Sequence, residues 1–264
     1  MSIELEKAGL DKSQKISTIA QLNPSLCKDT DSIKHVTETI SKTGHRRIPI
    51  VSRRKKFIGI ITAMDILDAY LRKQDFNEKI SMIMTRDVIF CEKDDAIGYV
   101  LQKFKISRRG TLPVLHKSKL VGIVTEREMV KHFSKINFGM KVEELMTRKP
   151  FIIKPTITIL DALKTIVNTH YRRLPIVDNK KLVGFITAID ILNVMSKNNN
   201  FSSKLSEPIE SIMIKNVYSV KKTEDVSDAI KIMEKNGIGG LPVADEDNTL
   251  EGLITERDIL EEIV

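Results

Sequence analysis

The sequence of 264 residues has no apolar run of about 18 residues or more, so it predicts no transmembrane helix. Its first residues, 1–7, are rich in charge and lack the apolar stretch of a secretory signal. Only two cysteines are present, Cys27 and Cys91, which is too few for a disulfide framework. These absences predict a cytoplasmic protein with no membrane partner.

The residue patterns of catalysis are missing as well. There is no Cys-x-x-Cys pair, no glycine-rich phosphate loop, no nucleophile beside a base and no pair of catalytic acids, and the five histidines show no metal-ligand spacing. Cys27 and Cys91 align with aliphatic residues of the later repeats described below, so we interpret them as core strand residues. We therefore expect no catalytic residues, no metal site and no enzyme activity.

Signatures of nucleic-acid binding are sparse. The chain has four tyrosines and nine phenylalanines, and it lacks helix-turn-helix and zinc-finger patterns, which argues against a nucleic-acid partner. The formal net charge of +8 still permits nucleic acid, a phosphate-bearing ligand or an acidic protein. Because the lysines are dispersed along the chain, most of them are typical of an ordinary solvated surface.

What the sequence does contain is one motif in four copies. Gly-x-x-Thr-x-x-(Asp/Glu) recurs with its threonines 63, 62 and 68 residues apart. The copies are Gly59–Asp65, Gly122–Glu128, Gly184–Asp190 and Gly252–Asp258. A period of this length indicates an array of supersecondary units, and a hydrophobic fraction of 41% is enough to give them packed cores.

Each repeat predicts the same order of elements. A short helical turn leads to a short apolar strand (151–153 in the third repeat), an amphipathic helix, a strand through a proline, a strand that ends at the motif threonine, and a second helix. The fold class is therefore α/β (α+β), with four β-α-β-β-α units of about 55 residues, small for an independent core. The aligned prolines are Pro49, Pro113, Pro175 and Pro242, and the expected N-caps of the first helices are Thr30, Asp94, Thr156 and Thr223.

The alignment also predicts domain boundaries and a higher order of organisation. It gives an N-terminal tail at 1–14 and repeats 1 to 4 at 15–72, 78–134, 140–197 and 207–264. Repeats 1 and 3 share Arg-Arg-(Ile/Leu)-Pro-Ile-Val and Thr-Ala-x-Asp, whereas repeats 2 and 4 share Thr-Glu-Arg-(Glu/Asp). Because so small a unit exposes an apolar sheet face, we expect each repeat to pair with its neighbour.

The Thr-x-x-(Asp/Glu) turn has two interpretations. In a capping box the threonine caps the helix and the acid caps back. In a ligand site the carboxylate binds a ribose diol, while the hydroxyl and the exposed helix N–H groups bind a phosphate, and such strand-to-helix turns often hold ligands. The sequence leaves both open for Thr62, Asp65, Thr125, Glu128, Thr187, Asp190, Thr255 and Asp258.

Basic residues immediately precede the proline strand in repeats 1 and 3: His45, Arg46 and Arg47 in repeat 1, and His170, Arg172 and Arg173 in repeat 3. In repeat 2 the pair Arg108 and Arg109 is offset by two positions and is weaker evidence. The planar guanidinium donates to phosphate through two hydrogen bonds, so we favour phosphate binding over a solvated face for the arginines. The histidines either contact the phosphate or lie on the surface.

The β-α-β-β-α unit, the Gly-x-x-Thr-x-x-Asp turn and the (Arg/Gly)-x-(Leu/Ile)-Pro-(Ile/Val) strand together resemble the cystathionine-β-synthase (CBS) domain family over residues 15–264. The resemblance implies two Bateman modules, each a pair of repeats, with clefts for adenosine ligands such as AMP, ADP, ATP or S-adenosylmethionine. In architecture, four repeats resemble the regulatory gamma subunit of AMP-activated protein kinase. By position, the resemblance implies ribose contacts for Asp65, Asp190 and Asp258, phosphate or ribose contacts for Thr62, Thr187 and Thr255, and phosphate contacts for Arg47 and Arg173, while Glu128 departs from the pattern.

Two functional hypotheses follow. The first is a regulatory sensor that binds AMP, ADP or ATP, requires no cofactor, and acts on an unidentified separate protein, as a monomer or a homodimer. The second is a structural or nucleic-acid-interacting CBS scaffold without bound nucleotide. Titration with nucleotides separates them.

Overall fold

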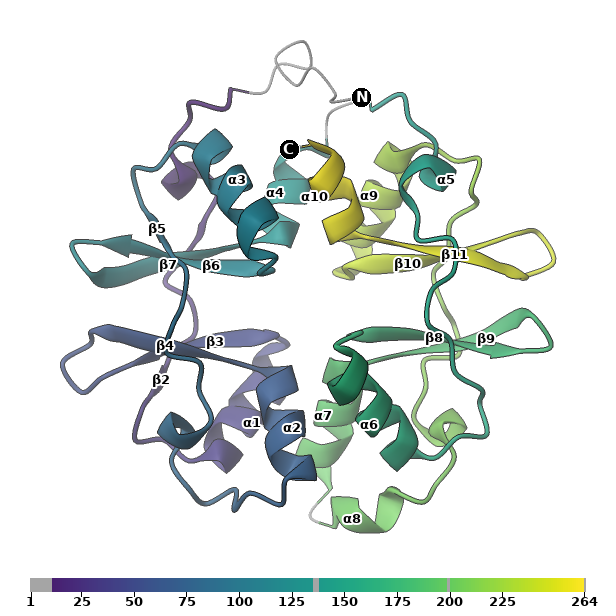
Figure 1. The fold of residues 1–264 in the computed structure, drawn as a ribbon, viewed down its shortest axis with the longest axis horizontal. Coiled ribbons are helices and arrows are strands. Elements are labelled where there is room, and N and C mark those ends of the chain that lie inside the picture. Colours follow the sequence, from purple (N-terminus) through teal and green to yellow (C-terminus); the bar gives the residue numbers. More distant parts are fainter. Residues whose placement is uncertain (1–10, 135–137, 199, 264) are drawn as a thin grey trace. The chain divides into compact units, whose positions relative to one another are not determined.

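Repeats that alternate along the sequence pack together in space (Figure 1). The computed structural model describes residues 11–134, 138–198 and 200–263. Unit 1 comprises Met1–Pro24, Ile89–Pro150 and Tyr218–Val264, and it holds most of repeats 2 and 4. Unit 2 comprises Ser25–Val88 and Phe151–Val217, and it holds most of repeats 1 and 3.

In unit 2, each repeat contributes a helix, a β-hairpin and a second helix. In repeat 1, strand β3 pairs in parallel with β2 and antiparallel with β4. In repeat 3, β8 and β9 form an antiparallel hairpin, and a single parallel bridge from Ile153 to Ile176 stands where repeat 1 has β2. The elements are β2 (Cys27–Lys28), α1 (Ile33–Thr43), β3 (Arg47–Val51), β4 (Phe57–Thr62), α2 (Ala63–Leu71), η2 (Ile80–Met82), α6 (Ile159–Thr169), β8 (Arg173–Asp178), β9 (Lys181–Thr187), α7 (Ala188–Lys197), α8 (Phe201–Lys204) and η3 (Ile209–Ser211).

Unit 1 repeats this plan. Its larger sheet has the strand order β1-β7-β6-β5, and its second hairpin, β10-β11, carries a single parallel bridge from Val220 to Val243. The elements are η1 (Ile16–Thr18), β1 (Gln21–Leu22), β5 (Cys91–Glu92), α3 (Ile97–Ser107), β6 (Thr111–His116), β7 (Lys119–Thr125), α4 (Glu126–His132), α5 (Val142–Leu145), α9 (Val226–Asn236), β10 (Gly240–Ala244), β11 (Leu250–Thr255) and α10 (Glu256–Ile263). The predicted α/β class and the order of elements are confirmed.

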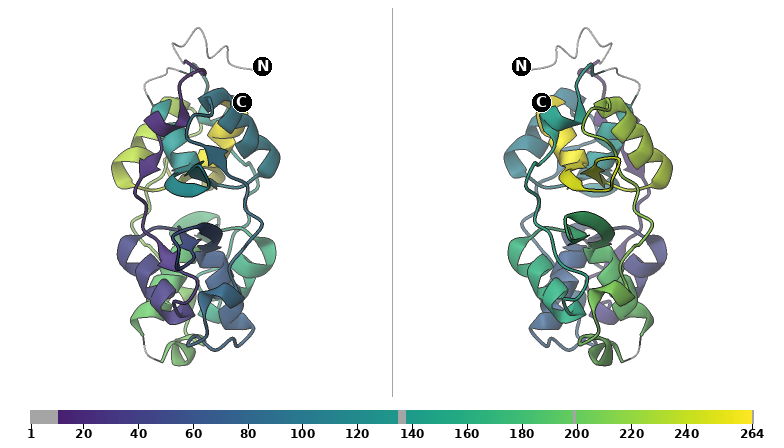
Figure 2. Two further views of the ribbon diagram at one scale, coloured as in Figure 1. Left: turned by 90° about the vertical axis from the view of Figure 1, so that its left-hand side faces the viewer. Right: turned by 90° about the vertical axis from the view of Figure 1, so that its right-hand side faces the viewer.

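The core of each unit lies between the helices of its two repeats. The helices gather on one side of the hairpins (Figures 1 and 2), with α1 and α2 against α7 in unit 2 and α4 against α9 and α10 in unit 1. The apolar face that the sequence predicts for the first helix is buried, since Ile33, Val36 and Ile40 have no exposed surface. Cys27 and Cys91 are also buried, as expected. Each fully buried aliphatic side chain adds about 1.5–3 kcal/mol to the free energy of unfolding, so a helix that presents only one apolar face depends on the other repeat.

The predicted helix N-caps are wrong by two residues. Helix α1 begins after Ser32, whose hydroxyl accepts from the backbone, and not after Thr30. The caps of the corresponding helices are Ala96, Thr158 and Asp225. The reason is tertiary: carbonyl groups of residues 76–78 accept hydrogen bonds from the first N–H groups of α1, Ile33 and Lys34, both at 2.9 Å. The backbone N–H groups at the start of α1, which a local cap would otherwise satisfy, thus donate to the segment that opens the next repeat.

The motif glycines are required because the opening segment of another repeat passes close to the strand at each of them. At Gly59 an added Cβ would lie 2.7 Å from the carbonyl oxygen of Thr85, because Thr85 and Ile60 exchange two backbone hydrogen bonds of 2.9 Å. An added Cβ would also lie 2.9 Å from Gln21 O at Gly122, 2.5 Å from Met213 Sδ at Gly184 and 2.9 Å from Thr147 O at Gly252. Only glycine leaves room for this contact.

These contacts show that consecutive repeats exchange their opening segments. The start of repeat 2 lies on the hairpin of repeat 1, and the start of repeat 1 lies on the hairpin of repeat 2. Repeats 3 and 4 make the same exchange, through Phe185 with Ile214 and through Thr147 with Leu253. The pairs of consecutive repeats therefore arise from exchanged segments, whereas the helical cores join alternate repeats.

The longest described helices have 11 residues. None of the helices in the described part of the chain combines the length and the apolarity that crossing a bilayer requires.

Candidate functional site

Each motif threonine ends a strand and caps the helix that follows. In repeat 1, Thr62 Oγ1 accepts from the backbone N–H of Asp65 at 3.3 Å, while Thr62 N and Oγ1 donate to Asp65 Oδ2 at 2.8 and 2.7 Å. The same reciprocal contacts join Thr187 to Asp190, Thr255 to Asp258 and, with glutamate as the acid, Thr125 to Glu128. The capping interpretation of the motif is confirmed in all four repeats.

The cap uses only part of each carboxylate. Both contacts from Thr62 reach Oδ2 of Asp65, and both contacts from Thr187 reach Oδ2 of Asp190. Burial raises the pKa of both carboxyl groups above the ordinary value, and the hydrogen bonds from the two threonines oppose this rise. A ligand that donates a hydrogen bond to Oδ1 would stabilise the charged form of a carboxylate that burial disfavours.

The second arginine of each basic pair lies beside the capped turn. Arg47 opens β3 and stands opposite Thr62 in the β3-β4 ladder, and Arg173 opens β8 and stands opposite Thr187. All four of these residues are half-buried. The antiparallel pairing therefore brings each arginine to the end of the hairpin where the strand passes into a helix.

The basic pair of repeat 1 acts on two repeats. The charge of Arg47 lowers the pKa of Asp65, partly offsetting burial and the neighbouring Asp68. Arg46, the residue before it, lowers the pKa of Asp190, which belongs to repeat 3. Unit 2 thus brings together carboxylates and arginines that lie more than a hundred residues apart in the chain.

The two histidines beside the arginine pairs do not hold equivalent positions. His170 is exposed and forms the left-handed C-cap of α6 at φ 59°, the place that Gly44 takes after α1 at φ 68°. His45 follows Gly44, is half-buried, and its N–H donates to Thr43 Oγ1 at 3.3 Å. His45 and His170 therefore do not play equivalent roles in repeats 1 and 3.

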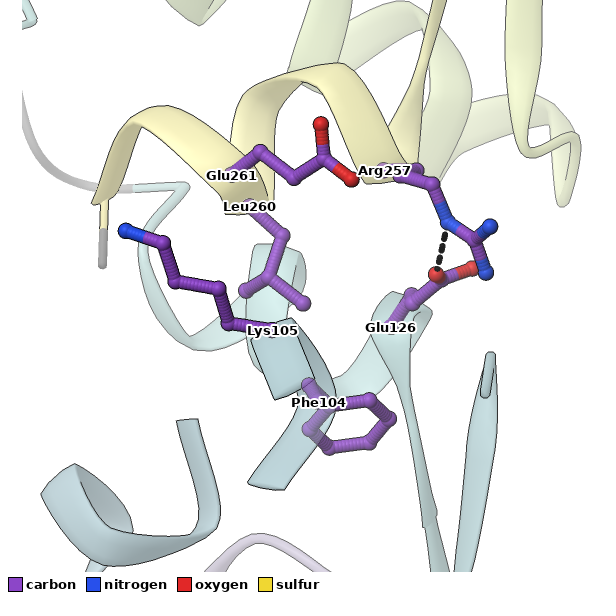
Figure 3. Close-up of a pocket in the computed structure, with 6 residues that line it drawn as sticks. All are labelled: Phe104, Lys105, Glu126, Arg257, Leu260 and Glu261. Atoms are coloured by element: carbon purple, nitrogen blue, oxygen red, sulfur yellow. Dashed lines mark hydrogen bonds and ion pairs between the residues drawn. The ribbon is translucent and has the colours of Figure 1, made fainter. Parts of the chain in front are cut away.

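Unit 1 uses its version of the motif to join two helices. Arg127 Nε donates to Glu256 Oε1 at 2.9 Å. Arg257 Nε donates to Glu126 Oε1 at 2.8 Å (Figure 3). Both glutamates are buried, and the pairs link α4 of repeat 2 with α10 of repeat 4. The corresponding residues in unit 2 are Ala63, Met64, Ala188 and Ile189. The Glu-Arg pair that distinguishes repeats 2 and 4 therefore serves helix packing.

A small hollow adjoins one of these pairs. Besides Glu126 and Arg257 it is lined by Phe104, Lys105, Leu260 and Glu261 (Figure 3). Its volume of about 10 Å³ holds about one water molecule, whereas ligand pockets measure about 300–1,000 Å³. This hollow is not a nucleotide site.

An apolar surface beside the basic pair of repeat 3 was missed in the sequence. Residues 151–153 read as a strand, but only Ile153 is buried, while Phe151 and Ile152 are 44% and 47% exposed. The ring of Phe151 lies 6.1 Å from that of Tyr171, which directly precedes Arg172. Exposed apolar side chains stand at similar places in the other repeats: Leu26, Ile89, Phe90 and Tyr218. Apolar residues recur at this place in all four repeats, and this recurrence was the signal available in the sequence.

The repeats match a known family. Residues 16–72, 80–135, 142–197 and 209–264 each match the CBS domain. Because these segments make up most of the sequence, the chain belongs to the CBS domain family, and the resemblance inferred from its motifs is confirmed. Its four CBS domains form two Bateman pairs.

Three known proteins resemble this chain over most of its length. Uncharacterized protein MJ1225 of Methanocaldococcus jannaschii is 28% identical over 257 residues, 88% of this chain and 92% of that protein. Its crystal structure, described as that of a proposed archaeal homolog of g-AMPK, matches with a TM-score of 0.88 at 27% identity and covers 95% of this chain and 100% of that chain. An uncharacterized 33.4 kDa protein in the ribosomal RNA operon of Thermofilum pendens is 28% identical over 240 residues, 81% of this chain and 79% of its own length. An uncharacterized conserved protein from Pyrococcus horikoshii has the same fold, with a TM-score of 0.67 at 22% identity over 95% of this chain and 100% of that one.

Proposed function

We propose that this chain is a regulatory module that binds an adenine nucleotide (AMP, ADP or ATP) and adjusts the activity of a separate protein. The observation that carries the proposal is the convergence in unit 2 of two half-buried carboxylates with two arginines, Asp65 with Arg47 and Asp190 with Arg46. A nucleotide presents the complementary groups, a ribose diol that donates and a phosphate that accepts.

The carboxylates suit the ribose. Each lies at the start of a helix, held by its threonine through Oδ2, so Oδ1 of Asp65 or Asp190 has a defined position. Diol hydroxyls donating to that oxygen would replace water lost on burial. The helix N-terminus behind the carboxylate favours the negative charge that the cap and the ligand share.

The arginines suit the phosphates. Arg47 and Arg173 each stand one strand away from a capped turn, within the same hairpin. A guanidinium binds phosphate through paired hydrogen bonds and stays charged at every physiological pH. The assignment of Arg46 and Arg172 to the same phosphate region rests on their neighbouring positions and on the influence of Arg46 on Asp190.

The exposed apolar residues suit the base. Phe151 and Tyr171 lie next to Arg172 and Arg173 in unit 2, and both rings are accessible. An aromatic surface beside cationic groups can stack a purine while its phosphates reach the arginines. The similarity to MJ1225, described as a proposed archaeal homolog of g-AMPK, also supports an adenine nucleotide.

The test is calorimetric titration of the full chain with AMP, ADP, ATP and adenosine. Arg47→Ala should weaken nucleotides by about ten- to a hundredfold, because a charge-assisted hydrogen bond is worth about 1.5–3 kcal/mol, and should leave adenosine nearly unchanged. Arg53→Ala is the matched control, since Arg53 is an exposed arginine in the turn of the same hairpin. Equal losses in Arg47→Ala and Arg53→Ala would mean that net charge alone attracts the phosphates.

The ribose role is tested by Asp190→Asn at a temperature where both proteins are folded. We expect weaker binding of nucleotides and adenosine alike, since the ribose is common to them. Unchanged affinities would return Asp190 to a capping role only.

The alternative is a CBS scaffold that holds no nucleotide, and the net charge of +8 favours it modestly. If millimolar AMP, ADP and ATP give no heat of binding and leave the melting temperature unmoved, the scaffold is the better account. A bound nucleotide at a hundredfold excess over its Kd adds about 2.7 kcal/mol, which such measurements resolve.

A further inference from the structure

Three different metal-ligating side chains meet at the start of repeat 1, outside the residues assigned above. Cys27 lies on β2, Asp31 lies in the turn that follows, and His35 lies in the first turn of α1. The Sγ atom, a carboxylate oxygen and an imidazole nitrogen lie within 4.8 Å of one another. Cys27 is buried, Asp31 is half-buried and His35 is exposed, so the cluster opens to solvent on one side.

The cluster is held in place by the backbone around it. Lys28 N donates to Asp31 Oδ2 at 2.7 Å, which orients the carboxylate and leaves its other oxygen for a further contact. Thr39, one turn along α1, donates through Oγ1 to the carbonyl of His35 at 2.9 Å. Positioned ligands of this kind lower the cost of collecting them around an ion.

In repeat 2 a lysine side chain lies at the place that corresponds to this cluster. Cys91 and Asp95 align with Cys27 and Asp31, and the residue that aligns with Thr39 is Lys103. Lys103 Nζ lies 3.3 Å from Asp95 Oδ2 and donates to the carbonyl of Phe90 at 2.9 Å. Burial raises the pKa of the Cys91 thiol, and the charge of Lys103 opposes that rise. In repeat 2 an ammonium group thus contacts the carboxylate, and its charge acts on the thiol.

Repeat 1 has a neutral threonine there and adds an imidazole at the position of Tyr99. We propose that Cys27, Asp31 and His35 form a binding site for a divalent transition-metal cation of the zinc class, which takes in repeat 1 the place that the Lys103 ammonium takes in repeat 2. The sequence led to the opposite expectation, because its histidines show no metal-ligand spacing and Cys27 aligns with aliphatic core residues, whereas the three ligands here are of three types, spaced four residues apart.

The donor set fits zinc better than calcium or magnesium. Thiolate and imidazole are ligands for zinc and its neighbours, whereas magnesium and calcium prefer oxygen alone. Zinc bonds of about 2.0–2.3 Å put tetrahedral donors about 3.3–3.8 Å apart, so donors that lie within 4.8 Å of one another have to approach by about 1–1.5 Å. Three protein ligands leave a fourth position for water or another ligand.

Metal binding here must release a proton. Burial raises the pKa of the Cys27 thiol to about 11. The metal ligand is the thiolate, so the thiol proton leaves on binding and the affinity rises with pH. The site therefore predicts proton release on binding as well as heat.

The experiment titrates the full chain with Zn²⁺ by calorimetry and with Co²⁺ by absorption, in a buffer free of chelators. The wild type should bind one ion with a thiolate-to-cobalt charge-transfer band. His35→Ala, a change at an exposed position that leaves the core intact, should weaken binding about tenfold or more. Cys27→Ser should abolish the band, whereas Cys91→Ser, the same change at the aligned cysteine, should keep it.

Thr39→Lys gives a gain-of-cation control. It places in repeat 1 the lysine of repeat 2, and we expect it to exclude zinc while preserving the fold. Zinc affinity equal in wild type and His35→Ala, a cobalt band that persists in Cys27→Ser, or no binding of either ion by the wild type would each overturn the proposal. Because no nucleotide is used, these outcomes are independent of the proposed nucleotide function.

Discussion

The reciprocal ion pairs between α4 and α10 predict a large cost for one substitution and a small cost for two. Arg257→Ile gives repeat 4 the residue that repeat 3 has at the same position, Ile189. It leaves Glu126, which is 7% exposed, without the partner that lies 2.8 Å away. Removing one member of a buried pair costs about 3–5 kcal/mol. Because the Arg257 side chain is 33% exposed, water reaches the pair, and we expect the lower limit, about 3 kcal/mol.

The double substitution Glu126→Ala with Arg257→Ile removes both charges. It gives unit 1 the residue types that unit 2 has at these two positions, Ala63 and Ile189. Replacing a whole buried pair by apolar residues is often neutral or stabilising, so we expect the double variant to lose about 1 kcal/mol or less relative to the wild type. The double-mutant cycle should therefore give a coupling energy of about 2 kcal/mol or more.

The assay is urea unfolding followed by circular dichroism, with hydrogen exchange of the α4 and α10 amides reporting on unit 1. Lys231→Ile is the control for loss of an exposed pair, since Lys231 and Asp228 are 66% and 50% exposed, and it should cost about 0.5 kcal/mol or less. If the double variant loses the sum of the two single losses, the pairs stabilise the helix contact through more than charge compensation, and the reasoning fails.

Three further outcomes follow from the motif and its surroundings. Gly59→Ala should destabilise by about 1–3 kcal/mol in chemical denaturation, because its Cβ would lie 2.7 Å from a backbone carbonyl; an unchanged midpoint would show that the crossing segment yields freely. Because burial raises the pKa of Asp190 in the folded state, its carboxyl group contributes fully to the unfolding free energy below about pH 3.9. That contribution is lost as the pH rises through the folded pKa. The unfolding free energy of the wild type relative to Asp190→Asn should therefore decrease across that window, and parallel pH profiles would contradict the assignment. Ala substitution at Gly44, where φ is 68° and no atom lies within 4 Å, should cost about 1 kcal/mol through backbone strain alone, and a larger loss would point to an unseen contact.

Local chemistry made much of this protein predictable from its sequence. The capping boxes join residues three apart, such as Thr62 and Asp65, so their geometry follows from the helix start itself. Apolar faces with helical spacing and strands that end at a repeated threonine gave the order of elements and the CBS family. The placement of Arg47 opposite Thr62 also follows from a short hairpin within one repeat.

Contacts between distant segments decided the rest. The N-cap of α1 moved to Ser32 because residues 76–78 satisfy the helix N-terminus, and Gly59 is glycine because Thr85 crosses it. The partners Glu126 and Arg257 are 131 residues apart, so only the packing of repeat 2 on repeat 4 explains why these repeats carry Thr-Glu-Arg. The sequence determined what each repeat is. The tertiary structure decided which repeats share a core, because an apolar helix face does not specify, by its own pattern, the face that buries it.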